Sequence, residues 1–327
     1  MHMADALVSA PVAVTAGIAA AALIVIASRK VSRSRRQDIV PLMGVMGAFV
    51  FAAQMINFSI PGTGSSGHII GGVLLAALLG PWAAFITLAS VLIIQCFVFA
   101  DGGMMALGCN LLNMGVVSCL IAYPFIYRPI VNNSTGKGRI MLGSMLACVV
   151  GLEIGALMVT GETELSGVTE LPAAVFLGFM LPIHLAIGLG EGLATGALLC
   201  FVASYKPDML YRTGGICGVS EAGPARKKRG MSRRTKVVLL TFAVFALVFA
   251  AGFTWLASSD PDGLEWSISK ITGAAEIGES LTPATAFMPD YDSTFSGVVG
   301  GLIVVVLLWG FCSILFRRRR IAAGVKD

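Results

Sequence analysis

Eight long apolar runs constrain this chain more than any other feature of its sequence. A transmembrane helix needs about 20 consecutive apolar residues. Runs of this kind cover residues 10–28, 39–58, 82–100, 104–127, 140–160, 172–204, 236–257 and 295–316. Hydrophobic residues make up 56% of the chain and charged residues only 13%, against about 45–50% and about 25% in soluble domains. We therefore predict an all-α polytopic membrane protein, and we exclude a cytosolic enzyme, a disulfide scaffold and a nucleic-acid binder.

A ninth apolar segment, residues 68–79, is too short to cross a bilayer. Its residues would span about 18 Å as a helix. It follows the glycine-rich stretch 59–68 and ends at Gly80-Pro81. Irregular backbone at membrane depth is tolerated mainly where it is buried or lines a cavity. We therefore expect an irregular structure for residues 59–68 and a place for them near a binding site.

The basic residues sort to one side of the membrane when all nine segments are counted and the N-terminus is placed outside. In that arrangement 22 of the 23 Lys and Arg residues lie inside, and only Lys270 lies outside. Because the first basic cluster follows the first apolar run, that run is expected to stay as an uncleaved anchor. We predict a multi-pass protein of a bacterial-type inner (plasma) membrane, with the N-terminus outside and the C-terminus cytoplasmic.

A basic linker divides the chain. Residues 1–205 form a seven-segment core, residues 206–235 form the cytoplasmic linker, and residues 236–327 form a two-span accessory unit. The outer loop of the accessory unit, 258–294, carries seven acids against one Lys, and such a field attracts cations. We expect this loop to assist metal delivery without supplying ligands. A chain truncated after about residue 235 should therefore take up less metal in cells and still hold it when purified.

Met1 and His2 together offer an unusual set of nitrogen donors. Removal of the initiator methionine normally requires a small second residue, so Met1 should keep a free amine. That amine, the backbone nitrogen of His2 and the His2 Nδ1 can chelate one metal through a five-membered and a six-membered ring. His68, on the same side of the membrane by the charge argument, can add a fourth nitrogen. A planar set of four nitrogens suits Ni(II) or Cu(II) rather than Zn(II). The competing interpretations are an incidental terminal His2 and a His68 bonded to loop carbonyls.

Polar residues within the later spans allow further interpretations. His184 and Glu191 share a helix face, and Glu153 is a second acid within a span. We favour a tightly packed polar helix interface over a role in the metal path. A stripe of small residues that lets another helix approach closely consists of Gly188, Gly192 and Gly196. The short pattern around Ser66, with His184 as a base, also matches an intramembrane serine protease of the rhomboid type, which is our alternative from another class.

Several blocks of the sequence resemble one family of transporter components. The Met1-His2 start resembles that of the membrane substrate-binding (M) components of nickel/cobalt energy-coupling-factor transporters. Other blocks that share this resemblance are 51–58, 64–72, 79–84, 101–103 and 106–115, together with Gln95. Pro261-Asp262-Gly263-Leu264-Glu265 matches the signature of the PDGLE-type accessory (N) component. The chain thus looks like a fused M–N protein.

The resemblance implies a function and a set of ligands. It implies that Met1, His2 and His68 bind the metal, and that the chain is a substrate-specific component rather than an enzyme. Its partners would be a transmembrane coupling (T) subunit and cytoplasmic ATPase subunits. Ni(II) is the expected transported substrate, with Co(II) as the alternative and with no organic cofactor. Candidate polar groups that support the ligands are Gln54, Asn57, Ser66, Gln95, Asn110 and Asn113.

Overall fold

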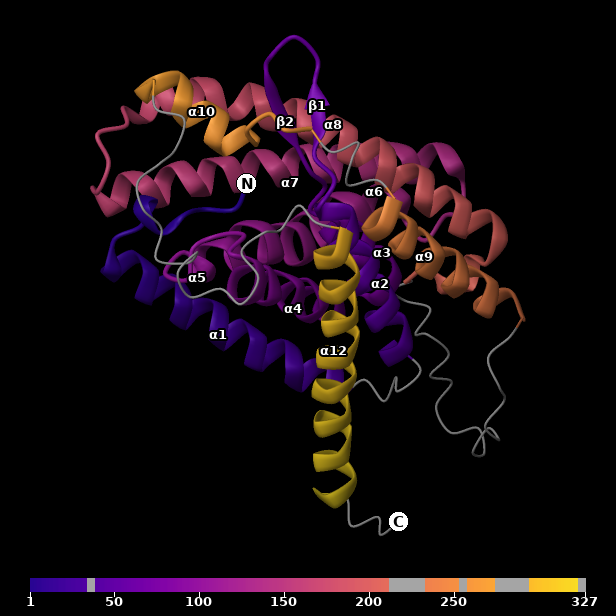
Figure 1. Ribbon diagram of the computed structural model, residues 1–327. Coiled ribbons are helices and arrows are strands. Elements are labelled where there is room, and N and C mark those ends of the chain that lie inside the picture. Colours follow the sequence, from indigo (N-terminus) through magenta and orange to yellow (C-terminus); the bar gives the residue numbers. More distant parts are fainter. Residues whose placement is uncertain (34–38, 212–232, 253–257, 274–293, 323–327) are drawn as a thin grey trace.

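The computed structural model describes residues 1–33, 39–211, 233–252, 258–273 and 294–322, and these residues are mostly helical (Figure 1). Six helices are long and apolar enough to cross a membrane within this part of the chain. They are α1 (Ala10–Arg33), α4 (Pro81–Phe99), the continuous helix Leu107–Val131, α7 (Lys137–Ser166), α8 (Ala173–Tyr205) and α12 (Thr294–Ala322). Two shorter apolar helices are α2 (Ile39–Gln54) and α9 (Arg233–Gly252). The predicted all-α polytopic class is confirmed.

The helix over residues 107–131 is built from three consecutive parts. These are α5 (Leu107–Asn110), η2 (Leu111–Tyr127), which is wound as a π-helix, and α6 (Arg128–Val131). The predicted span 104–127 falls on it, with an offset of a few residues at each end. Sequence patterns place such ends poorly, because caps rather than apolar runs decide where a helix starts and stops.

α7 and α8 run side by side and pack closely (Figure 1). The close approach occurs at the three glycines of α8. A Cβ added at Gly188 would lie 2.8 Å from the Cα of Val149, and one at Gly192 would lie 2.7 Å from the Cα of Met145. One at Gly196 would lie 2.5 Å from the sulfur of Met141. Small residues at this spacing let the two backbones come together, which raises dispersion contacts where no hydrophobic effect acts between helices.

The short apolar segment forms α3 (Gly72–Leu79), an eight-residue helix whose side chains are all buried. It cannot cross a bilayer, as its length predicted. At its far end, the backbone nitrogen of Tyr211 donates to the carbonyl oxygen of Ala77 at 2.7 Å. The first residues of the linker therefore close the end of α3 that lies away from His68.

Residues 58–67 form a β-hairpin, although we expected irregular backbone over 59–68. β1 (Phe58–Ile60) pairs antiparallel with β2 (Ser65–Gly67). The hairpin satisfies its own backbone groups, and this is required where the chain is buried. Gly67 allows it to press against α8, since a Cβ there would lie 2.5 Å from Ile187 Cγ1.

The accessory unit contacts the core in two places. α9 and α12 pack against α2 and against each other. α10 (Gly263–Thr272) packs on α8 and on the hairpin (Figure 1). Asp262 caps α10, because its Oδ1 accepts from the backbone nitrogens of Leu264 and Glu265 at 2.8 and 2.9 Å. The other predicted acids of this loop, from Glu276 onward, lie outside the described residues.

Candidate metal centre

The first residues of the chain are threaded into the core in an extended form. The backbone nitrogen of Met3 donates to Asn110 Oδ1 at 2.7 Å, and Asn110 Nδ2 returns a bond to the carbonyl of Met3 at 3.2 Å. Gly103 also donates to this carbonyl, at 2.8 Å. Asp5 Oδ1 accepts from the backbone of Met105 at 2.8 Å. These bonds fix the position of Met1 and His2 relative to the helix that begins at Leu107.

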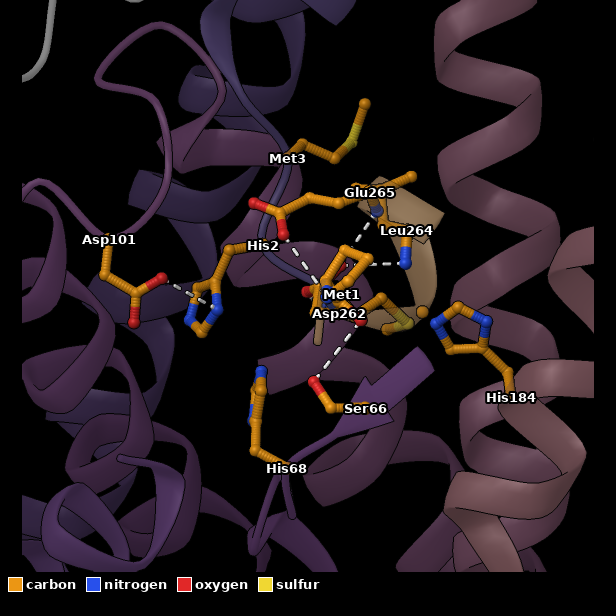
Figure 2. Close-up of polar contacts among 12 residues, drawn as sticks. Met1, His2, Met3, Ser66, His68, Asp101, His184, Asp262, Leu264 and Glu265 are labelled. Atoms are coloured by element: carbon orange, nitrogen blue, oxygen red, sulfur yellow. Dashed lines mark hydrogen bonds and ion pairs between the residues drawn. The ribbon is translucent and has the colours of Figure 1, made fainter. Parts of the chain in front are cut away.

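His2 and His68 come together at this end of the molecule. Their rings stack with a centroid distance of 5.1 Å and an interplanar angle of 25°. His68 follows β2 directly, so the close contact of Gly67 with α8 sets its position. Figure 2 shows both rings on one side of Met1 and His184 on the other. The two histidines that the sequence predicted to act together are therefore neighbours.

Both imidazoles are held neutral. Burial and the positive charge of the terminal amine lower the pKa of His2 to about 3. Burial, that same charge and His2 lower the pKa of His68 to about 4. A histidine binds a metal through a neutral nitrogen, so neither ring has to lose a proton near pH 7. The site is built of donors that are ready to coordinate.

The terminal amine of Met1 is held by an acid from the accessory unit. Its nitrogen lies 2.6 Å from Asp262 Oδ2, with side-chain exposures of 2% for Met1 and 15% for Asp262. Burial alone would raise the pKa of Asp262, but the adjacent ammonium group holds it below its ordinary value. We expected the acidic loop to act at a distance from the metal ligands, and the structure places one of its acids in direct contact with the amine.

The ring orientation of His2 differs from that of the predicted chelate. Its Nδ1 lies 3.2 Å from Asp101 Oδ1, while its Nε2 is buried and has no hydrogen-bond partner among the described residues. His68 Nδ1 lies 3.2 Å from the carbonyl oxygen of Ile69, which leaves Nε2 for a ligand. The described residues contain no group of three or more His, Cys, Asp and Glu side chains that could hold a metal. A metal here would depend on the amine and on backbone nitrogen.

Two glutamines and a glutamate fix the chain next to His68. Gln95 Nε2 donates to Gln54 Oε1 at 2.7 Å, and Gln54 Nε2 donates to the carbonyl of Ile70 at 2.8 Å. Glu191 of α8 accepts from the backbone nitrogens of Ile70 and Gly71, each at 2.9 Å. Its negative charge also lies at the N-terminus of α3, where the helix dipole favours it. The arrangement gives Glu191 a positional role that its sequence context did not reveal.

The remaining candidate groups lie around the site with separate partners. Asn113 Nδ2 donates to Glu162 Oε2 at 2.7 Å and approaches the sulfur of Met3 at 3.5 Å. Ser66 Oγ donates to the carbonyl of Asp260 at 2.7 Å, and the backbone carbonyl of Asn57 accepts from Ser258 at 2.8 Å. Ser66 and Asn57 thus bind the accessory unit rather than the histidines.

The protease interpretation fails on geometry. A serine nucleophile needs a base within hydrogen-bond reach. Ser66 Oγ donates to backbone carbonyls of the accessory unit, and His184 Nδ1 bonds the carbonyl of Met180 in its own helix at 2.8 Å. His184 Nε2 is buried without a hydrogen-bond partner among the described residues. The two side chains do not form a catalytic pair.

Fold and site together define a polytopic membrane protein with a buried, nitrogen-rich donor site at one end. The chain belongs to the family of cobalt uptake substrate-specific transmembrane regions (CbiM), whose model matches residues 2–209. A PDGLE domain matches residues 236–317. The resemblance seen in the sequence, a core and a PDGLE unit in one chain, is confirmed.

Known relatives agree with this assignment. The chain is 27% identical over 324 residues to the fused nickel transport protein NikMN of Rhodobacter capsulatus, covering 94% of this chain and 86% of that protein. It is 27% identical over 293 residues to the cobalt transport protein CbiM of Geobacter sulfurreducens, covering 85% and 79%. A crystal structure of a truncated transition metal transporter matches with a TM-score of 0.55 and 30% identity, over 62% of this chain and 99% of that one. These proteins are transport components, which confirms that the chain is not an enzyme.

Proposed function

We propose that this protein captures Ni(II) at the outer face of the plasma membrane and is the substrate-specific component of an ATP-driven importer. The metal would be bound by the Met1 amine, by the backbone nitrogen and Nδ1 of His2, and by His68. The observation that carries the proposal is the meeting of three parts at one buried point: the terminal amine, His2 and His68. Both rings are neutral there, and the chain that presents them is fixed by hydrogen bonds.

Binding in this form requires a local rearrangement. The imidazole of His2 turns about its Cβ–Cγ bond, which moves Nδ1 away from Asp101 and toward the amine. The Met1 amine gives up a proton, and the backbone nitrogen of His2 gives up another. None of these changes moves a helix, so they are compatible with the packed core around the site.

Nickel is the preferred substrate and cobalt the alternative. A planar set of nitrogens suits Ni(II), and a relative that carries both the core and the accessory unit is named for nickel transport. Cobalt remains the second candidate because other relatives are named for it. Import would rely on a transmembrane coupling subunit and cytoplasmic ATPase subunits, since the sequence lacks a phosphate-binding G-x-x-x-x-G-K-[ST] motif.

The decisive experiment inserts one alanine between Met1 and His2. The insertion keeps every side chain but moves His2 to the third position, where its own amide nitrogen no longer shares a five-membered ring with the amine. We expect nickel titration of the purified protein to show a large loss of affinity, together with loss of the absorption band of planar Ni(II). The parent protein, analysed for bound metal after purification, is the control.

A rival ligand set makes the opposite prediction. If His2 and His68 bound the metal with oxygen ligands, an extended terminus could place the imidazole again after the insertion. Affinity within about threefold of the parent would therefore refute the amine-ligand model. Metal analysis showing cobalt in place of nickel would shift the substrate assignment and leave the ligands unchanged.

A further inference from the structure

α10 and the turn before it are docked on the core by contacts that do not involve the metal ligands. The backbone nitrogen of Ser66 donates to the carbonyl of Pro261 at 2.8 Å, and Trp266 Nε1 donates to the carbonyl of Thr63 at 3.0 Å. Gly263 rests on α8, since a Cβ there would lie 3.0 Å from Ile187 and 3.2 Å from Ile183. The turn therefore keeps its place through several independent contacts.

The two carboxylate oxygens of Asp262 have different tasks. Oδ1 accepts from the backbone nitrogens of Leu264 and Glu265 and so caps α10. Oδ2 faces away from the helix and lies 2.6 Å from the nitrogen of Met1 (Figure 2). An asparagine or a serine could cap the helix as well as an aspartate does. Capping alone therefore does not explain why an aspartate lies against the amine.

We propose that Asp262 is a positioning residue of the metal site, so that the accessory unit completes a site whose ligands all belong to the core. This inference rests on the proposed function. An amine that binds a metal through its lone pair keeps N–H bonds, and Oδ2 is placed to accept from one of them. A carboxylate that accepts from a metal ligand orients that ligand and raises its basicity, and loss of such a partner typically costs about 10–100-fold in metal affinity.

The position of the amine supports this role. Met1 is held from three sides: Asn110 and Gly103 bind the backbone of Met3, and the side chain of Met1 is buried against Gly155 of α7, where an added Cβ would lie 2.5 Å from its terminal carbon. Those contacts fix the residue but leave the direction of the amine open. Asp262 is the group that sets this direction.

Two substitutions separate the positioning role from the cap. Asp262→Asn keeps the shape and one oxygen for the cap, so an amide NH2 group, which cannot accept, faces the amine. Asp262→Ser keeps a capping oxygen but is too short to reach the amine. Asp260→Asn, two residues away in the same turn, is the matched control, because the core contacts Asp260 through its backbone carbonyl.

The full-length protein is measured in two ways. Nickel titration should show affinity about 10–100-fold weaker for both Asp262 variants and within about threefold of the parent for Asp260→Asn. Labelling of the Met1 amine in metal-free protein with an amine-specific reagent should be several-fold faster in the Asp262 variants. Fluorescence of Trp266, read against a Trp266→Phe background, should report that α10 stays docked.

Parental affinity and parental labelling rates in both Asp262 variants would overturn the inference while leaving the proposed function intact. A parent protein that binds no nickel would refute the proposed function, and the labelling rates would still decide whether Asp262 holds the amine. If the Asp262 variants fail to fold, Gly263→Leu provides a second route. Its side chain would collide with Ile183 and Ile187 and lift an intact Asp262 away. The same loss of affinity is then expected, and parental affinity would again contradict the inference.

Discussion

Each part of the candidate site is prepared for metal by its local surroundings. Burial and the adjacent amine lower the pKa of both His2 and His68, so protons compete little for the imidazoles near neutral pH. The amine is different, because it is held as an ammonium group by Asp262. The protonation chemistry of metal capture is therefore concentrated at the first two backbone positions of the chain.

Replacing His68 by alanine should abolish high-affinity nickel binding and leave the protein folded. The change removes one of four nitrogens, while the hairpin and α3 keep their backbone bonds. Nickel retained after dialysis is the measurement, and thermal unfolding in detergent checks the fold. His184→Ala is the matched control, because it removes a buried imidazole that is not among the proposed ligands. A His68→Ala protein that still holds one equivalent of nickel would show that His68 is not a ligand.

Nickel binding at pH 7 should release about two protons per metal, one from the amine and one from the His2 amide. A free terminal amine has a pKa of about 7.7–8, and the imidazoles, with pKa values of about 3 and 4, contribute almost none. Affinity should accordingly fall as pH falls from 8 to 6, well above the range in which the rings protonate. Calorimetric titration in buffers of different ionisation enthalpy counts the protons. Release of none would favour a site of imidazoles and oxygen ligands.

The sequence predicted the metal ligands better than it predicted their surroundings. Met1 and His2 are adjacent, so covalent geometry alone decides which chelate rings they can form. The contact of Met1 with Asp262 joins residues 261 positions apart, and no local pattern reports such a contact. The ring orientation of His2 was equally out of reach, because it depends on Asp101 in a distant loop.

At the scale of elements, α3 is held at both ends by other segments. Glu191 binds the two backbone nitrogens that precede it, and Tyr211 binds the carbonyl of Ala77 near its end. A helix of eight residues has little stability of its own, so these contacts and its complete burial keep it in place. Because His68 lies just before α3, the position of this helix also sets the position of a proposed ligand.

Glu191→Gln should weaken nickel binding and lower the unfolding temperature. One of the two backbone nitrogens loses its carboxylate acceptor, and an unsatisfied buried group costs about 1–3 kcal/mol. Thermal unfolding and nickel titration measure the two effects. Glu153→Gln is the control: Glu153 Oε1 has no hydrogen-bond partner among the described residues, so the same substitution should change both quantities little. Equal behaviour of the two variants would contradict the proposed anchoring of the His68 segment.

The elements themselves were largely predictable, since apolar length and flanking charge select membrane helices whatever their packing. The β-hairpin was not, because a stretch of Gly, Ser and Thr has no strand pattern. Its pairing becomes favourable only where α8 and the accessory unit bury it. The same reason explains Ser66, which we expected near the metal and which instead binds the turn before α10.

At the scale of the molecule, two units share one site, and truncation tests how they share it. A chain ending near residue 235 keeps all the proposed ligands but loses Asp262 and the outer loop. We expect uptake in cells to fall and the purified core to keep bound nickel with the weaker affinity of the Asp262 variants. Uptake assays and metal analysis measure the two outcomes. Complete loss of metal from the truncated core would mean that the accessory unit supplies a ligand.

The docking of α10 on the hairpin has a consequence for how the site responds to protein abundance. When two binding partners are carried by one chain, their encounter depends on an effective concentration set by the connecting segment and not on how many molecules are present. The fraction of cores that carry Asp262 at the Met1 amine should therefore be the same in a sparsely and a densely populated membrane. A cell that makes only a few copies of this protein still makes each one complete.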